Sequence, residues 1–179
     1  MTWPASVLAG SPGPGTTRVL LAHGVPAACV VEPAADAAQF DSESLWLQLR
    51  QRPWRDARVL IVRGDGGREW LADTLRDAGA AVTHLAAYRR TAPAFDARRV
   101  SILNEAIAQP AAHLWFFSSS EAVDNLAAVV PSVTSWQEAC ALATHPRIAE
   151  RARGLGFGRV DEARPTPSAV IACIQSARP

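Results

Sequence analysis

In the last third of the chain, short apolar runs typical of buried strands alternate with segments whose apolar residues recur at helical spacing. The apolar runs LWFFSSS at 114–120 and CALAT at 140–144 read as buried strands, and each is followed by apolar residues at helical spacing. A third strand, GRVDEA at 158–163, precedes a final helix at 166–177 with Thr166 as its expected N-cap. Strands that alternate with helices at this spacing predict a parallel sheet covered on both faces.

The first third of the chain repeats part of this rhythm. It reads as strand, Gly/Pro turn, helix, glycine, strand, loop and helix. Pro14 and Gly24 fall on Pro146 and Gly156 at one constant offset. We therefore expect two lobes built on the same βαβα plan. The comparison also shows an opening strand and helix in the second lobe that the first lobe lacks.

The middle of the chain holds one further strand–turn–helix unit. Residues 59–79 read VLIVRGDGGREWLADTLRDAG, an apolar run that stops at a charged, glycine-rich turn before an amphipathic helix. The next segment, AVTHLAAY, alternates only weakly and leads through two arginines and a proline to a helix at 96–109. An extended crossover suits it better than a sheet interior does. The predicted α/β organisation is a first lobe at 1–82, a linker at 83–95 and a second lobe at 96–179.

Composition narrows the classes of function. Hydrophobic residues make up 49% of the chain, enough to bury a core. No apolar run approaches the roughly 18 residues that span a bilayer, and no signal peptide opens the chain, so no membrane partner is expected. The cysteines Cys29, Cys140 and Cys173 are far apart and in no metal-binding spacing, which predicts free thiols, a reducing cytoplasm and no metal. A net charge of +1 gives no field that favours nucleic acid.

The basic residues are all arginine. The chain has 18 of them and no lysine, which excludes mechanisms that need a Schiff-base lysine or a P-loop lysine. Arginine instead pairs with a carboxylate or phosphate through two parallel hydrogen bonds. A GC-rich genome produces the same bias. In either case an anionic ligand would be held by arginine and backbone N–H groups.

Three strand-to-helix turns are candidate anion sites. The turn at 63–69, RGDGGRE, lacks the third glycine of a dinucleotide fingerprint, so it is either a carboxylate-binding turn or a plain βα turn. The turns at 13–17 and 118–122 place hydroxyls and N–H groups at helix starts, where they serve as caps or as anion sites. No GxSxG motif occurs and no histidine has a visible partner, so no hydrolase triad is predicted. Tyr88, the only tyrosine, stands beside two arginines and either donates a proton or packs.

Taken in order, these pieces resemble uroporphyrinogen-III synthase. The similarity runs through GPGT with its helix, DSESL, VLIVRGDGGREWLADTLRDAGAAV, AAYRR, FFSSSEAV, PRIAERARGLGF and PTPSAV, and so covers nearly the whole chain. It implies two flavodoxin-like lobes on an extended linker, with the active site between them and no metal or organic cofactor. The implied substrate is hydroxymethylbilane, a linear tetrapyrrole with two carboxylates per ring. The implied reaction is a lyase-type cyclisation that loses water and inverts the last ring.

The resemblance also implies roles for residues. Tyr88 matches the tyrosine that is the candidate proton donor. The positions implied to bind substrate are Thr16, Arg63, Gly64, Gly66, Gly67, Arg68, Ser118 and Ser120. The sequence HPRI at 145–148 departs from the family's threonine turn, and there we expect Arg147 to bind a carboxylate instead.

A second departure lies at the start of the chain. The family's first strand and helix of each lobe have no counterpart after Met1, so we expect an N-terminally short chain, free sheet edges and a homodimer formed through them. Two alternatives to the enzyme remain. One is an inactive two-lobed protein that binds tetrapyrroles or anions. The other is an unrelated Rossmann-like nucleotide enzyme, against which the missing lysine and fingerprint argue.

Overall fold

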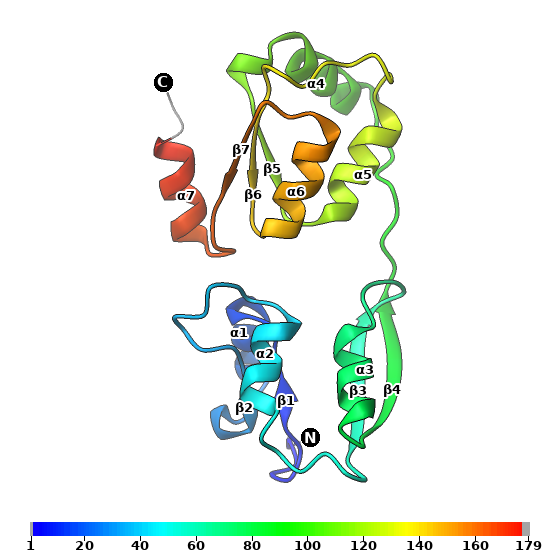
Figure 1. The fold of residues 1–179 in the computed structure, drawn as a ribbon, viewed down its shortest axis with the longest axis vertical. Coiled ribbons are helices and arrows are strands. Elements are labelled where there is room, and N and C mark those ends of the chain that lie inside the picture. The colour runs from blue at the N-terminus through cyan, green and yellow to red at the C-terminus, as the bar shows by residue number, and fades with distance from the viewer. Residues whose placement is uncertain (1, 177–179) are drawn as a thin grey trace. The chain divides into compact units, whose positions relative to one another are not determined.

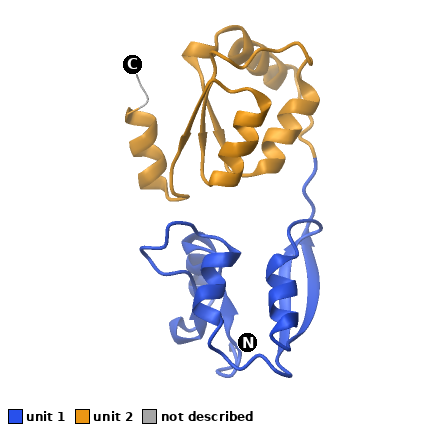
Figure 2. Cartoon of the chain, in the orientation of Figure 1, with its two compact units in different colours: residues 1–91 blue, residues 92–179 orange. Residues whose placement is uncertain are grey.

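The computed structural model describes residues 2–176 and divides the chain into two compact units, residues 1–91 and 92–179 (Figure 2). Every strand pairing in both units is parallel, and helices lie between successive strands in the sequence. The predicted α/β class with two lobes is therefore confirmed. The division falls after Thr91, inside the segment expected to be a linker.

Unit 1 contains two separate sheets of two strands each within the described residues (Figure 1). The first sheet pairs β1 with β2, and the second pairs β3 with β4. In chain order its elements are β1 (Ala9–Gly10), α1 (Pro14–Ala22), the short 3-10 helix η1 (Ala27–Cys29), β2 (Val30–Val31), α2 (Ser42–Leu49), β3 (Arg58–Gly64), α3 (Trp70–Asp77) and β4 (Ala81–Tyr88).

Strand β4 is the main departure from the sequence pattern. Residues 83–88, which the pattern places in an extended crossover, are instead strand residues paired with β3. Helix α3 buries its Ala72 and Leu75 side chains, but in β4 only Val82 is partly buried and the other seven residues are exposed. A strand without a buried face shows no strong apolar alternation, so the periodicity was too weak to reveal it.

Unit 2 is built on one parallel sheet with strand order β5-β6-β7. Helices α5 and α6 lie side by side against it in Figure 1. In chain order the elements are α4 (Ala97–Ala108), the 3-10 helix η2 (Pro110–Ala112), β5 (Leu114–Phe117), α5 (Ser120–Val129), β6 (Cys140–Ala143), α6 (Pro146–Leu155), β7 (Arg159–Glu162) and α7 (Pro167–Ser176). The predicted strand–helix order is confirmed, and the Thr166 hydroxyl accepts from the Ala169 N–H at 3.3 Å, as an N-cap does. Position 177 of the predicted last helix lies outside the described residues.

The larger hydrophobic core also lies in unit 2. Its aromatic part packs tightly, with the Trp136 and Phe157 ring centroids 4.8 Å apart and the Trp115 and Trp136 centroids 5.3 Å apart. Between sheet and helix the core is made of small residues, and Ala149 and Ala152 of α6 are completely buried. Small side chains let α6 approach the sheet closely, which fixes the turn at the helix start relative to the strand ends.

Three of the helices end in the same way. At the ends of α1, α3 and α6, a glycine with positive φ is followed by a residue whose N–H bonds five positions back, as in a Schellman motif. The glycines are Gly24, Gly79 and Gly156. Each leads toward the next strand of its βα unit. Helices α1 and α6 also both begin with a proline, so the repeat predicted from proline and glycine spacing is present in the backbone.

Candidate functional site

The glycine-rich turn of residues 64–69 lies at the carboxyl end of β3, beside the carboxyl end of β4. This is the edge at which parallel sheets of α/β proteins bind ligands. Gly64 is the last residue of β3 and pairs with Tyr88, the last residue of β4. The turn and the tyrosine, which the sequence singles out separately, therefore lie together in unit 1.

Arg63 is held by two contacts inside the turn. Its guanidinium donates to the Arg68 carbonyl oxygen at 3.2 Å and forms an ion pair with the Glu69 carboxylate. The second Glu69 oxygen lies 3.4 Å from the His84 Nε2 atom of β4. The hydrogen bond from Arg63 lowers the pKa of the Glu69 carboxyl below its ordinary value, although partial desolvation acts in the opposite direction. Arg63 thus orients the turn as well as offering a positive charge.

Two other arginines near this turn also meet carboxylates. Arg68 pairs with Glu43 of α2 at 2.5 Å, and Arg89 pairs with Asp65 at 3.1 Å. Helix α3 begins only at Trp70, so Arg68 precedes the helix rather than beginning it. The sequence gives no sign of these partners, because each pair joins residues about 25 positions apart.

Gly66 and Gly67 form the open part of the turn. A Cβ atom at either position would meet nothing within 4 Å, and Gly67 has a φ of 130°. A side chain at Gly67 would therefore be strained, although there is space for it. The open backbone at these two glycines fits the expected role of exposing N–H groups to a ligand.

Tyr88 is half exposed and bounded on two sides. Its ring lies next to Gly64, whose missing side chain leaves room for it. Arg90 donates from Nη2 to the phenol oxygen at 3.1 Å, and its guanidinium carbon lies 5.4 Å from the ring centroid. Tyr88 is therefore not a core residue, and its hydroxyl lies at the surface of unit 1.

The turn that contains Thr16 belongs to the other sheet of unit 1. Thr16 is exposed in the first turn of α1, and the next residue, Thr17, donates to the Glu32 carboxylate. The turn itself is supported by Ser11, which is fully buried and whose hydroxyl donates to the Gly13 carbonyl oxygen at 2.8 Å. Sequence reasoning missed Ser11, although a serine two residues before a glycine is a recognisable hydroxyl-turn signal.

In unit 2 the serine turn follows β5. Ser119 caps α5, since its hydroxyl accepts from the Ala122 N–H at 3.2 Å. The expected ligand residues, Ser118 and Ser120, flank this cap. Ser118 is exposed and Ser120 is half-buried. The helix is therefore capped by Ser119, the one serine of the three that was not expected to contact a ligand.

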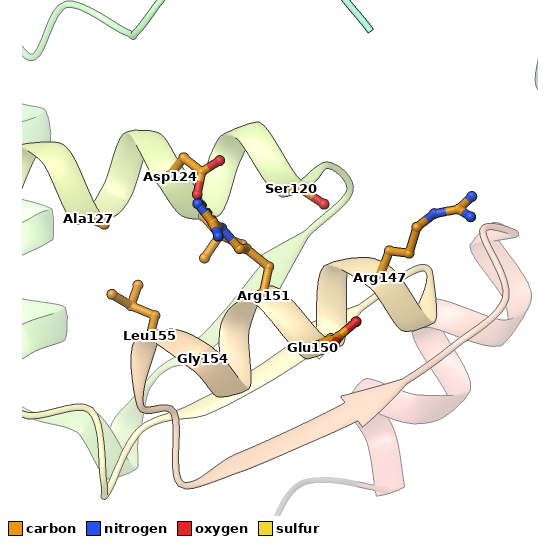
Figure 3. A pocket seen from close by; sticks show the side chains of 9 residues that line it. Ser120, Asp124, Ala127, Arg147, Glu150, Arg151, Gly154 and Leu155 are labelled. Atoms are coloured by element: carbon orange, nitrogen blue, oxygen red, sulfur yellow. Dashed lines mark hydrogen bonds and ion pairs between the residues drawn. The ribbon is translucent and has the colours of Figure 1, made fainter. Parts of the chain in front are cut away.

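Ser120 and Arg147 line one groove between α5 and α6, with a volume of about 410 Å³. Arg151 Nε lies 2.6 Å from Asp124 Oδ1. Figure 3 shows Arg151 reaching toward Asp124, while the Arg147 side chain extends away from α5. His145 caps α6 by accepting from the Arg147 N–H at 3.1 Å. The cap of α6 is therefore supplied by a histidine side chain.

The remaining expectations concern metals and membranes. In residues 2–176 no three or more His, Cys, Asp or Glu side chains are grouped so as to hold a metal ion. No helix in that same range has the length and apolar character needed to cross a bilayer.

The chain matches a model of a known protein family. The family model described as uroporphyrinogen-III synthase HemD matches residues 1–172. This range covers most of the chain. The chain therefore belongs to the uroporphyrinogen-III synthase family, whose members act in tetrapyrrole biosynthesis.

Proposed function

We propose that this member of the uroporphyrinogen-III synthase family cyclises hydroxymethylbilane with inversion of its last pyrrole ring and loss of water. The observation that carries the proposal is the pairing of Tyr88 with the RGDGGRE turn at one sheet end. A single proton donor next to arginines and open backbone N–H groups suits a reaction that needs little acid–base chemistry and much positioning of a polyanion.

In the proposed reaction, Tyr88 assists departure of the hydroxyl group. The phenol donates its proton to the leaving oxygen, the C–O bond breaks, and water leaves an electrophilic azafulvene. The substituted α-carbon of the last ring then attacks the methylene carbon that carried the hydroxyl group and forms a spiro intermediate. The older bond between the spiro carbon and its bridging methylene then breaks, and that methylene bonds to the unsubstituted α-carbon of the last ring, which inverts the ring. The proton lost from this α-carbon restores the phenol. The Arg90 guanidinium stabilises negative charge that develops on the phenol oxygen while the proton is away.

The carboxylates of the bilane would be held by arginine and backbone N–H groups. In unit 1 the proposed contacts are Arg63, Arg68 and the N–H groups of Gly64, Gly66 and Gly67, with Thr16 as a hydroxyl donor. In unit 2 they are Ser118, Ser120 and Arg147. Since the chemistry uses only a proton and the substrate's own electrons, the proposal includes no cofactor. We place the reaction in the cytoplasm, because Cys29, Cys140 and Cys173 are free thiols, as a reducing compartment favours.

The test is incubation with freshly prepared hydroxymethylbilane, followed by chromatographic separation of the product isomers. The bilane closes spontaneously to the type I isomer, so a buffer blank gives the background. We expect type III product in proportion to protein concentration, with its yield lowered in the Tyr88→Phe variant. Type I product alone, at the rate of the blank, would refute the proposal.

The alternative is a protein that binds tetrapyrroles or anions without turnover. The observation in its favour is that Arg63, Arg68 and Arg89 lie at or next to the RGDGGRE turn, where their positive charges would attract an anion whether or not Tyr88 donates a proton. Equilibrium titration with the type III product, followed by quenching of tryptophan fluorescence, separates the two readings. Saturable binding together with type I product alone supports the binder.

We also propose that a second copy of the chain covers the open sheet surfaces of unit 1. On the face of the β3–β4 sheet away from α3, Leu60 and Val62 are each 59% exposed and Leu85 is 50% exposed. Apolar patches of this kind mark interaction surfaces. Two-fold symmetry would place the same uncharged patch opposite itself and bring the free edge of β3 to the partner.

The oligomeric state of matched variants tests this pairing. In size-exclusion chromatography with light scattering, the wild-type chain should elute as a dimer and Leu60→Ser should shift toward monomer. Val133→Ser is the control, because Val133 is 89% exposed but lies in a loop of unit 2. A wild-type monomer at micromolar concentration would exclude the dimer.

A further inference from the structure

A bulge in the β3–β4 ladder places Tyr88 opposite Gly64. The strands pair in step from Arg58 and Ala81 up to Arg63 and Ala86, and the register then shifts so that Gly64 pairs with Tyr88. The Asp65 N–H donates to the Tyr88 carbonyl oxygen at 3.0 Å and secures the shifted register. One extra residue on β4 is thereby accommodated, and such bulges redirect the side chain that follows them.

Gly64 is needed at this position for space. A Cβ atom there would lie 2.8 Å from Cε2 and 3.2 Å from Cζ of the Tyr88 ring. Carbon atoms in contact prefer separations of about 3.5–4.0 Å, so an alanine would push the ring away by nearly 1 Å. Gly66, two residues later in the same turn, has nothing within 4 Å of its Cβ position. A side chain at Gly64 would therefore displace the Tyr88 ring, whereas a side chain at Gly66 would not.

Arg90 fixes the other side of the ring and the role of the hydroxyl. Its Nη2 atom lies 3.1 Å from the phenol oxygen. A guanidinium has donors only, so the phenol oxygen must be the acceptor in this bond. The phenol hydrogen is then directed to a different acceptor. An arginine partner therefore presents Tyr88 as a proton donor, whereas a carboxylate partner would have taken up that hydrogen.

We infer that Gly64 and Arg90 are positioning residues that set where the Tyr88 O–H points. Gly64 lets the ring lie flat against the strand end, and Arg90 holds the oxygen. The effect of Gly64 on turnover passes through Tyr88. The kinetic part of this inference rests on the proposed function, but the position of the ring does not.

The first experiment observes the ring without using activity. Tyr88 is the only tyrosine in the chain, so incorporation of 3-fluorotyrosine gives a single ¹⁹F NMR signal. We expect Gly64→Ala and Arg90→Gln each to shift this signal, and Gly66→Ala to leave it in place. If Gly64→Ala fails to fold, Arg90→Gln still reports, since Arg90 is exposed. An unchanged signal in the folded variants would overturn the inference, whether or not the chain turns over bilane.

The second experiment is a double-mutant cycle with the bilane as substrate. A displacement of about 1 Å in a catalytic group can cost about 10²-fold, so Gly64→Ala should lower kcat by about that factor with little change in KM. In a Tyr88→Phe background the same substitution should cost nothing more, because the group it displaces is gone. An equal loss in both backgrounds would show that Gly64 acts on the substrate directly and would overturn the positioning role.

Discussion

Removal of the Tyr88 hydroxyl should lower the rate of turnover far more than the free energy of unfolding. Tyr88 is 51% exposed, and the hydroxyl takes part in one hydrogen bond to Arg90 at the surface. A hydrogen bond contributes about 0.5–1.5 kcal/mol to stability, and exposure places this one at the low end. Loss of a positioned proton donor lowers the rate by about 10²–10⁴-fold, which corresponds to about 2.7–5.4 kcal/mol in the barrier. The Tyr88→Phe variant should therefore fold nearly as well as the wild type and turn over far more slowly.

The assay measures both quantities on the same preparations. Initial rates of type III product give kcat, and urea unfolding followed by tryptophan fluorescence gives the free energy of unfolding. Trp3→Phe is a matched control, because it removes an aromatic N–H that donates to the Val7 carbonyl at 2.7 Å, away from the sheet end. It should lower stability by at least as much, because Trp3 also packs against the buried cluster of Ala9, Val25 and Cys29, and it should leave kcat unchanged. A Tyr88→Phe variant with kcat within twofold of wild type would refute the role of Tyr88.

Three further predictions address the turn and the core. Arg63→Gln should lower stability and raise the KM for bilane, whereas Arg68→Gln should raise KM alone, in a salt-dependent manner; steady-state kinetics and urea melts of both variants check this difference. Because the pKa of Glu69 is lower in the folded state, its stabilising effect is full above the unfolded pKa, about 4.3, and is lost as the pH falls through the folded value. Glu69→Gln should flatten that part of the pH dependence of unfolding, and an unchanged curve would count against the pairing. Gly158→Ala should destabilise unit 2 by at least about 1–3 kcal/mol, since its Cβ would overlap the Gln137 backbone in the segment between α5 and β6. Gly154→Ala meets nothing and should be neutral or stabilising in urea melts.

Local chemistry allowed much of the fold to be read from the sequence. Proline at the start of a helix and glycine after its end are signals that act through the backbone of a few neighbouring residues. Pro14 and Gly24 in unit 1, and Pro146 and Gly156 in unit 2, therefore marked two helices and the repeat that relates them. Strand β6 of unit 2 was equally visible because its residues Ala141, Leu142 and Ala143 are buried, and burial is what produces an apolar run.

Features that depend on distant residues could not be read in this way. Strand β4 is paired but mostly exposed, so its sequence carries no record of burial, and it was taken for a linker. The carboxylate partners of the arginines come from other elements, as Glu43 of α2 does for Arg68. The bulge that sets Tyr88 opposite Gly64 is a property of two strands together. A single sequence specifies such features only through the completed fold.

The ion pairs of the turn bear on how an anionic substrate would be admitted. The Arg63 side chain is 24% exposed and makes two contacts, whereas those of Arg68 and Arg89 are 45% and 78% exposed. Exposed pairs contribute about 0–1 kcal/mol each, so a substrate carboxylate could replace Glu43 or Asp65 at little cost. Each arginine is already oriented by its protein carboxylate and would then exchange that carboxylate for one of the substrate. Affinity gained in this way is small for any one contact, and selection of the folded bilane must come from satisfying several contacts at once.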